Sequence, residues 1–401
     1  MGYYPIIVTR NWDIPIKHSR DEYKKTGNKI IHEKKGIFEV FYLPFIPTFK
    51  NRLFEKFYGS KFYFLYLITA LFYGIGENLS SCFTPYKPLY SFCKKLLSEN
   101  KDISLMLISG SPFHLFKFGY KLRKDFGIRW IADYRDDWNT NELFKSSRSK
   151  RILQKISERN EIKWVNSAEF FISVSDHYVN KISKLLGGLP GYTILNGFLS
   201  DNYKGLIKCA QDHFTIAYVG SLYPNQPIQI FIEAYKRFID NTPEIKSKVI
   251  FVGLAAQPSP LEKIKRITQH YERFFEYTLR ISKKDAINIQ YNASVLLMVA
   301  YGNLKGIPGS KLYEFIALHK PVLVCPSDKG IIQKTLTETG QGYFANNVHE
   351  CYEMLNKLYS EYGKGFSQAK KINKEKVANY SRYKNVKKFS LLLDKILFKE
   401  T

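Results

Sequence analysis

The sequence predicts an α/β protein made of two doubly wound domains, each a parallel sheet with helices on both faces. Three observations support this prediction. A chain of 401 residues is too long for one hydrophobic core, so two domains are the default. Apolar strand-like runs alternate with helical patterns along nearly the whole chain. Contents of 45% hydrophobic and 16% aromatic residues exclude a disordered chain.

The strands of the first half are short apolar runs that end in polar or turn residues. They are predicted at residues 5–9, 38–43, 103–108, 128–132 and 170–174. Helices are expected after the turn at residues 109–112, over residues 149–166 and from residue 175 onward. Residues 199–212 have no clear period, so we interpret them as a linker between domains.

The second half repeats this alternation. Strands are predicted at residues 214–219, 248–252, 275–279, 294–299 and 321–324, and helices at 229–239, 283–291, 310–318 and 380–398. We therefore expect a first domain at residues 1–203, a second at 204–378 and a final helix at 379–401. In two such domains, ligands bind outside the carboxyl ends of the strands, in a cleft between the domains.

Cysteine usage and the first residues indicate a cytoplasmic protein. The five cysteines, which include no C-x-x-C pair, fit free thiols better than a disulfide framework or a zinc site: Cys82, Cys93, Cys209, Cys325 and Cys351. The chain starts with a strand-like run rather than a signal peptide.

The most apolar stretch, residues 62–75, is about 14 residues long and short of the ~20 that span a bilayer. Two interpretations stay open. It is either a buried core helix or a helix that lies in the membrane interface, as the neighbouring Lys50, Arg52, Lys56 and Lys61 favour.

The formal net charge of +25 requires either an anionic partner or many solvated lysines. Anionic membrane lipid is a candidate partner, since juxtamembrane cations are attracted to it. The sequence has no zinc pattern, no RNP-like motif and no Arg-rich arm, so we expect no nucleic acid.

Residues 306–314 carry the most promising binding motif. A Gly/Pro loop follows a buried strand and opens a helix at Ser310, and such a helix start attracts phosphate. Lys311 would add a point charge, and the Glu314 carboxylate would accept from ribose hydroxyls. The alternative is an ordinary Ser cap with a solvated Glu314.

Three other strand ends carry polar residues. Gly220 and Ser221 follow the first strand of the second half, where a glycine permits close approach of a ligand. Residues 133–138 place three carboxylates beside Arg135, either to orient an acceptor and supply a base or to fasten the loop by a salt bridge. His114 follows another strand, and it is either a structural or a catalytic histidine.

Five motifs follow one another along the chain, and their order carries a resemblance to a known family: S-G-S-P-F-H, I-A-D-Y-R-D-D-W, I-L-N-G-F, Y-V-G-S-L-Y and G-I-P-G-S-K-L-Y-E-F-I-A-L-H-K-P-V-L. Over nearly its whole length the chain resembles the bacterial GT-B glycosyltransferases of the large retaining group called family four. It is most similar to the branch that assembles surface polysaccharides.

This resemblance implies a GT-B fold of two Rossmann-like domains. The second domain would hold the nucleoside diphosphate of a donor sugar and the first would hold the acceptor, while the final helix would cross back onto the first domain. The positions that match the family's donor site are Gly220, Ser221, Arg280, Gly309, Ser310, Lys311 and Glu314. On the acceptor side, Arg135 and Asp136 would face the cleft.

Two features depart from the family pattern. Many members carry two glutamates with seven residues between them, and here the first of these falls on Gly306. Members also open with a strand, a glycine-rich loop and a helix before the segment that matches residues 2–9. Without that central strand we expect low stability or activity, which an upstream extension of the gene would raise.

The expected reaction is transfer of a hexose-type sugar from a nucleotide-sugar to a carbohydrate or lipid-linked acceptor, with no cofactor and no metal. Retention of configuration is favoured. If the enzyme inverts, Asp136 or His114 would be the base. The rivals are a sugar-nucleotide epimerase of the same architecture and a non-catalytic scaffold. The expected location is the cytoplasm, with peripheral binding to the inner face of the plasma membrane as an option.

Overall fold

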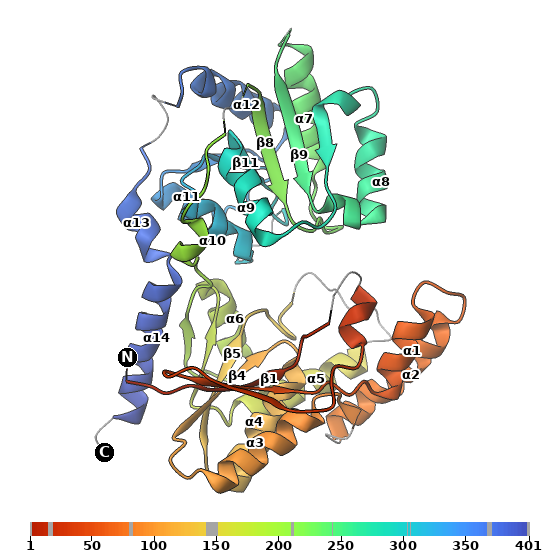
Figure 1. The fold of residues 1–401 in the computed structure, drawn as a ribbon, viewed down its shortest axis with the longest axis vertical. Helices are drawn as coiled ribbons and strands as arrows, with labels where there is room; N and C mark the ends of the chain where they lie inside the picture. Colours follow the sequence, from red (N-terminus) through yellow and green to blue (C-terminus); the bar gives the residue numbers. More distant parts are fainter. Residues whose placement is uncertain are drawn as a thin grey trace. The chain divides into compact units, whose positions relative to one another are not determined.

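The computed structural model describes residues 2–14, 19–79, 83–141, 151–209, 212–242, 244–302, 304, 306–366 and 371–398. The chain divides into two compact units, which Figure 1 colours along the sequence. Unit 1 comprises Met1–Ser173 and Val179–Tyr192, and unit 2 comprises Val174–Tyr178 and Thr193–Thr401. Both units contain parallel sheets with helices, so the predicted fold class is confirmed. Cys82 and the start of the helix predicted at residues 149–166 lie outside the described residues.

Unit 2 is built on a six-stranded parallel sheet in the order β10-β9-β8-β11-β12-β13. Its strands are β8 (Phe214–Val219), β9 (Ser247–Val252), β10 (Phe275–Tyr277), β11 (Val295–Met298), β12 (Val322–Val324) and β13 (Gly342–Phe344). Counted within the unit, this is the order 3-2-1-4-5-6 of a doubly wound sheet. In such sheets the ligand crevice lies where the winding reverses, here outside the carboxyl ends of β8 and β11.

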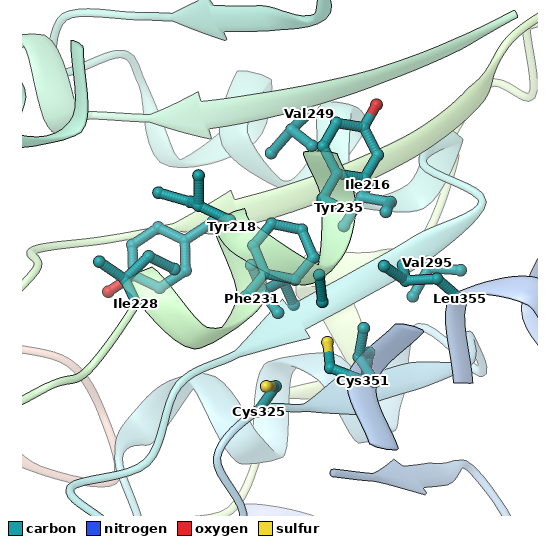
Figure 2. Close-up of a cluster of buried hydrophobic side chains, with 14 of the residues drawn as sticks. Ile216, Tyr218, Ile228, Phe231, Tyr235, Val249, Val295, Cys325, Cys351 and Leu355 are labelled. Atoms are coloured by element: carbon teal, nitrogen blue, oxygen red, sulfur yellow. The ribbon is translucent and has the colours of Figure 1, made fainter. Parts of the chain in front are cut away.

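Two apolar layers cover the faces of this sheet. Ile216 and Tyr218 of β8 pack into one layer with Phe231 and Tyr235 (Figure 2), while Ala217 belongs to the other. The first layer includes α7 (Gln229–Asp240), α8 (Pro258–Ile267) and α12 (Val348–Gly363). The second includes α9 (Lys283–Asn292), α10 (Ser310–Ala317), α11 (Ile331–Glu338) and α13 (Lys374–Asn379). Because every residue of β8 is buried, its sequence is a continuous apolar run, as expected for a central parallel strand.

Unit 1 contains two sheets rather than one. The first has the order β1-β3-β2, in which β1 (Ile6–Arg10) is parallel and β2 (Ile31–Lys34) antiparallel to β3 (Glu39–Leu43). The second has the order β4-β5-β6-β7, with bounds Leu105–Gly110, Arg129–Tyr134, Phe170–Ser173 and Gly191–Thr193. Strand β2 was not predicted because its sequence, IHEK, is polar and mostly exposed.

The helices of unit 1 are α1 (Phe49–Phe57), α2 (Tyr63–Leu79), α3 (Lys87–Glu99), α4 (Phe116–Phe126), α5 (Arg151–Val165) and α6 (Asp176–Leu185), the last of which begins in unit 2. Helix α4 follows the predicted turn at residues 109–112. It ends at Gly127, whose left-handed backbone lets its N–H donate to the Arg123 carbonyl.

Helix α2 contains most of the apolar stretch at residues 62–75. The prediction of a buried core helix is wrong, because its most apolar side chains face outward: Phe64, Leu65, Leu67, Ile68, Leu71 and Phe72 are all exposed. In the part of the chain that the structure describes, no helix is both long enough and apolar enough to cross a membrane.

The final helix, α14 (Arg382–Leu397), begins beside the turn at residues 196–198 within unit 2. The Phe198 N–H donates to the Tyr380 carbonyl, and the Arg382 N–H donates to the Phe198 carbonyl. At Gly197 a side chain would strain the backbone (φ 65°) and place its Cβ 2.8 Å from the Tyr380 oxygen. This turn therefore needs its glycine. That α14 packs on the first domain stays a prediction.

Candidate functional site

The switch point of the unit 2 sheet brings together two predicted donor residues. Gly220 follows β8 with a φ of 120°, and its N–H donates to the Val252 carbonyl at 3.1 Å. A Cβ added at Gly220 would lie 3.9 Å from Cε of Lys311, although the two residues are far apart in sequence. A glycine at this position leaves room for a ligand beside the lysine.

The start of α10 carries no capping side chain. Its N-cap is Gly309 and Ser310 is the first helical residue, so the interpretation of Ser310 as an ordinary cap is wrong. By contrast, Asp328 accepts from three N–H groups at the start of the neighbouring α11, and Ser282 caps α9. Gly309 and Ser310 are exposed, so the first N–H groups of α10 are available to an anion.

Lys311 and Glu314 form an ion pair one turn into α10. Lys311 Nζ lies 2.6 Å from Glu314 Oε2, and the side chains are 35% and 16% exposed. Burial, and secondarily the Glu314 charge, raises the pKa of Tyr203, which indicates that this tyrosine is close to the pair. The lysine supplies a cation for a phosphate, and the carboxylate supplies an acceptor for hydroxyl groups.

Gly306, expected from the resemblance at the first glutamate position, has no room for a side chain. It is buried with a φ of 80°, and an added Cβ would lie 2.5 Å from Cβ of His177. The Gly306 carbonyl also accepts from Ser175 Oγ at 2.8 Å. Both partners belong to the short segment Val174–Tyr178 of unit 2. A glutamate cannot replace Gly306 on this backbone.

Arg280 lies farther from the switch point of the sheet than Gly220, the residue directly after β8. It is exposed on the loop after β10, the outermost strand, two strand spacings or roughly 10 Å from β8. That loop is tied inward, because the Gly253 N–H donates to Thr278 Oγ1 at 3.0 Å. Arg280 therefore borders the switch point rather than lining it.

Two glutamines that the sequence analysis missed hold the loop at residues 221–226. Gln226 Nε2 donates to the Val299 carbonyl at 2.6 Å and its Oε1 accepts from the Tyr223 N–H at 2.9 Å. Gln257 Oε1 accepts from the Leu222 N–H at 2.9 Å. These bonds fix the loop beside Ser221 to the ends of β9 and β11. No local pattern marks them, because the partners are remote in sequence.

Asp133 organises the predicted acceptor-side cluster in unit 1. It is 2% exposed, and its Oδ2 accepts from Ser109 Oγ at 2.6 Å and from Arg135 Nε at 3.0 Å. Its Oδ1 is buried without a partner in the described residues. Arg135 is therefore fastened to Asp133, as the salt-bridge interpretation expected. Asp136 remains exposed at the surface, although neighbouring atoms partly desolvate its carboxyl group and raise its pKa.

His114 is a weak base in this structure. Burial, together with the charges of Lys50 and Lys117, lowers its pKa to about 4. Its Nε2 lies 2.6 Å from Thr84 Oγ1. The ring is therefore neutral at pH 7 and engaged with a threonine, which favours Asp136 over His114 as a candidate base.

Glu161 supports the loop at residues 133–138 and was also missed. It is fully buried on α5, where its carboxylate accepts from the Tyr134 hydroxyl at 2.9 Å and from Asn139 Nδ2 at 2.6 Å. Burial raises its pKa to about 7 against the lowering effect of these hydrogen bonds. No sequence signal marks Glu161, because it is one of several polar residues in a helical pattern.

Across the described ranges, no group of three or more His, Cys, Asp or Glu side chains could hold a metal ion. The cysteines Cys93, Cys209, Cys325 and Cys351 are free thiols. Burial raises the pKa of the Cys93 thiol to about 11, so this thiol is unreactive at neutral pH.

Comparison with solved structures defines the class of fold. The chain has the fold of GT-B glycosyltransferases, two Rossmann-like α/β domains. It is similar to an α,α-trehalose-phosphate synthase (UDP-forming) from Burkholderia vietnamiensis, with a TM-score of 0.64, 10% identity and complete coverage of both chains.

Two further solved structures share this fold. Sucrose-phosphate synthase from Thermosynechococcus elongatus matches with a TM-score of 0.64 and 13% identity over 99% of this chain and 100% of its own. HepE of Anabaena, solved in complex with UDP-glucose, matches with a TM-score of 0.56 and 14% identity over 77% and 82%. No protein-family profile and no curated protein sequence matches the chain.

Proposed function

We propose that the chain is a glycosyltransferase that moves a sugar from a nucleotide-sugar donor to a carbohydrate or lipid-linked acceptor in cell-surface polysaccharide synthesis. One observation carries this proposal. The uncapped start of α10, with Lys311 beside Gly220, lies at the switch point of a doubly wound sheet. That place combines helix N–H groups, a cation and open backbone, which together suit a diphosphate.

The chemistry follows from charge. When the bond between sugar and diphosphate breaks, negative charge develops on the leaving diphosphate, and the α10 N–H groups and Lys311 stabilise it. This stabilisation needs no metal and no cofactor. Glu314 would bind the ribose hydroxyls and hold the nucleotide in register, with Ser221 and Arg280 at the borders of the site. HepE, which shares the fold, was solved with UDP-glucose, and this supports a UDP-sugar as the first donor to test.

Ligand-induced thermal stabilisation tests the donor site. We expect one nucleotide-sugar from a panel of UDP, GDP, ADP and dTDP sugars to stabilise the protein by about 2.7 kcal/mol at a hundredfold excess over its Kd. This stabilisation is measured as a rise in Tm, and the Glu314→Ala variant should lose most of that rise because it lacks the contact to the ribose. The control is Glu353→Ala on the exposed face of α12, which should keep it. An unchanged shift in Glu314→Ala would mean that the donor site lies elsewhere.

The acceptor side is tested through the product. We expect retention of the donor's anomeric configuration, a reaction in which no protein base acts on the acceptor, and Asp136→Asn should then keep turnover within about tenfold. In an inverting enzyme the same substitution would lower turnover by about 10²-fold or more, since Asp136 is then the base. His114→Gln should be mild in both cases because the pKa of His114 is about 4. NMR of the product gives the configuration, and donor conversion without any acceptor would indicate an epimerase instead.

A further inference from the structure

Helix α2 turns its apolar side to solvent. The exposed side chains Phe64, Leu65, Leu67, Ile68, Leu71 and Phe72 cover roughly 160° of the helix at 3.6 residues per turn. Phe72 is 67% exposed and Leu67 54%. A surface helix of a water-soluble domain normally shows the opposite pattern, and a continuous exposed apolar face marks an interaction site.

The other side of α2 is fixed to unit 1. Tyr66 and Tyr63 pack edge-on against Phe54 of α1, with ring centroids 5.0 and 6.2 Å apart. At the far end, Glu77 Oε1 accepts from Lys50 Nζ at 2.7 Å and the Glu77 carbonyl accepts from Lys117 Nζ of α4 at 3.0 Å. The outward orientation of the apolar side is therefore set by packing on the tyrosine side.

Cations border the apolar side. Residues 49–79 contain the basic residues Lys50, Arg52, Lys56 and Lys61 but only two acidic ones. Within the described residues Glu77 is the one carboxylate of this hairpin in an ion pair, and its partner is Lys50. Exposed Lys56 and Lys61 instead lie over phenylalanine rings, each 5.3 Å from the ring centroid of Phe57 or Phe62.

We propose that the α1–α2 hairpin docks on an anionic phospholipid surface, with α2 parallel to it and its apolar side inserted among the acyl chains. The 17 residues of α2 are too few to span a bilayer, which needs ~20, but suit an interfacial helix. Lys56 and Lys61 then meet the phosphate headgroups, and the aromatic residues at the turn between the helices lie at headgroup depth.

A second copy of the chain is a poorer occupant of the same surface. A two-fold dimer through α2 would bring this surface against itself, and so place Lys56 and Lys61 of both copies at one interface. Each copy also carries a formal net charge of +25. Like charges oppose such a contact, whereas an anionic membrane attracts both the lysines and the whole molecule.

Docking through α2 would also orient unit 1. Lys117, which holds the carboxyl end of α2, is on α4, three residues after His114. Of the predicted acceptor-side residues, His114 therefore lies near the carboxyl end of α2, on the unit that would dock. The docking itself does not depend on the donor site of unit 2.

Vesicle co-sedimentation of the full chain tests this proposal. We expect binding to vesicles of phosphatidylcholine with about 30 mol % phosphatidylglycerol, and much weaker binding to phosphatidylcholine alone. The Leu67→Ser/Ile68→Ser/Leu71→Ser variant should lower the partition coefficient at least about a hundredfold. The Lys56→Glu/Lys61→Glu variant should lower the partition coefficient at least about tenfold. Raising NaCl from about 0.1 M to about 1 M should also weaken the binding of the wild type to these vesicles.

Matched controls separate docking through α2 from non-specific hydrophobic or electrostatic binding. Ile37→Ser/Ile207→Ser removes two isolated exposed apolar residues, and Lys263→Glu/Lys265→Glu reverses two exposed lysines of α8; both variants should bind vesicles like the wild type. In Phe72→Trp, brominated lipid should quench the new indole. Absence of wild-type binding, equal loss in controls and test variants, or a dimer that the Leu67→Ser/Ile68→Ser/Leu71→Ser variant dissociates without any vesicle binding would overturn the proposal.

Discussion

Replacing Lys311 by methionine is expected to lower kcat by about 10²–10³-fold, the usual cost of removing one group that stabilises charge in a transition state. The lysine is half-buried at the start of α10, beside Gly220, so its replacement removes a positive charge from the place where the diphosphate would bind. The helix N–H groups remain in the variant, and we therefore expect residual activity rather than none.

Two controls make the Lys311→Met result interpretable. Lys334→Met removes an exposed lysine from the start of α11, where Asp328 already caps the helix, and should leave turnover unchanged. Stability of Lys311→Met should stay within about 1 kcal/mol of the wild type, since its ion pair with Glu314 is partly exposed. Wild-type turnover in Lys311→Met, measured with a saturating donor, would contradict the assigned role.

Replacing Glu161 by glutamine is expected to change the pH dependence of stability by about 3 kcal/mol. The pKa of Glu161 is raised by burial from 4.5 to about 7 in the folded chain. Between these values the folded chain keeps a proton that the unfolded chain has lost, so the wild-type free energy of unfolding falls as pH rises, by about 1.4 kcal/mol per unit. Glutamine mimics the protonated acid and removes this fall.

Urea unfolding at pH 4.5 and pH 8 measures the effect. Relative to the wild type, Glu161→Gln should gain stability as pH rises through this window. Glu158→Gln, one turn earlier on α5 and not fully enclosed, serves as the matched control. It should stay close to the wild-type curve, because the Glu158 charge is the smallest of the causes that act on the pKa of Glu161. If Glu161→Gln and the wild type show parallel curves, folding does not raise the pKa of Glu161.

Unit 2 was predictable because its strands are buried on both faces. The run at residues 214–219 coincides with β8, and the strand at 248–252 differs from β9 by one residue. Continuous apolar runs identify such strands, and Gly/Pro loops mark their carboxyl ends. The start of α10 at Ser310 was likewise predicted, because a Gly/Pro loop precedes it.

Unit 1 was less predictable because its segments depend on remote contacts. Strand β2 forms only by pairing with β3, and its polar sequence gives no strand signal. The apolar run of α2 fits a core helix and a surface helix equally well, since packing on Phe54 decides which side is covered. The roles of Gln226 and Glu161 come from partners that lie far along the chain.

Calorimetric titration measures whether the start of α10 binds the diphosphate of a donor nucleotide. We expect one nucleoside diphosphate, with UDP tested first, to bind at least about a hundredfold more tightly than its nucleoside. The Lys311→Met variant should lose most of this difference. Equal affinity for nucleoside and nucleoside diphosphate, or a difference that survives in Lys311→Met, would mean that the start of α10 does not bind the diphosphate.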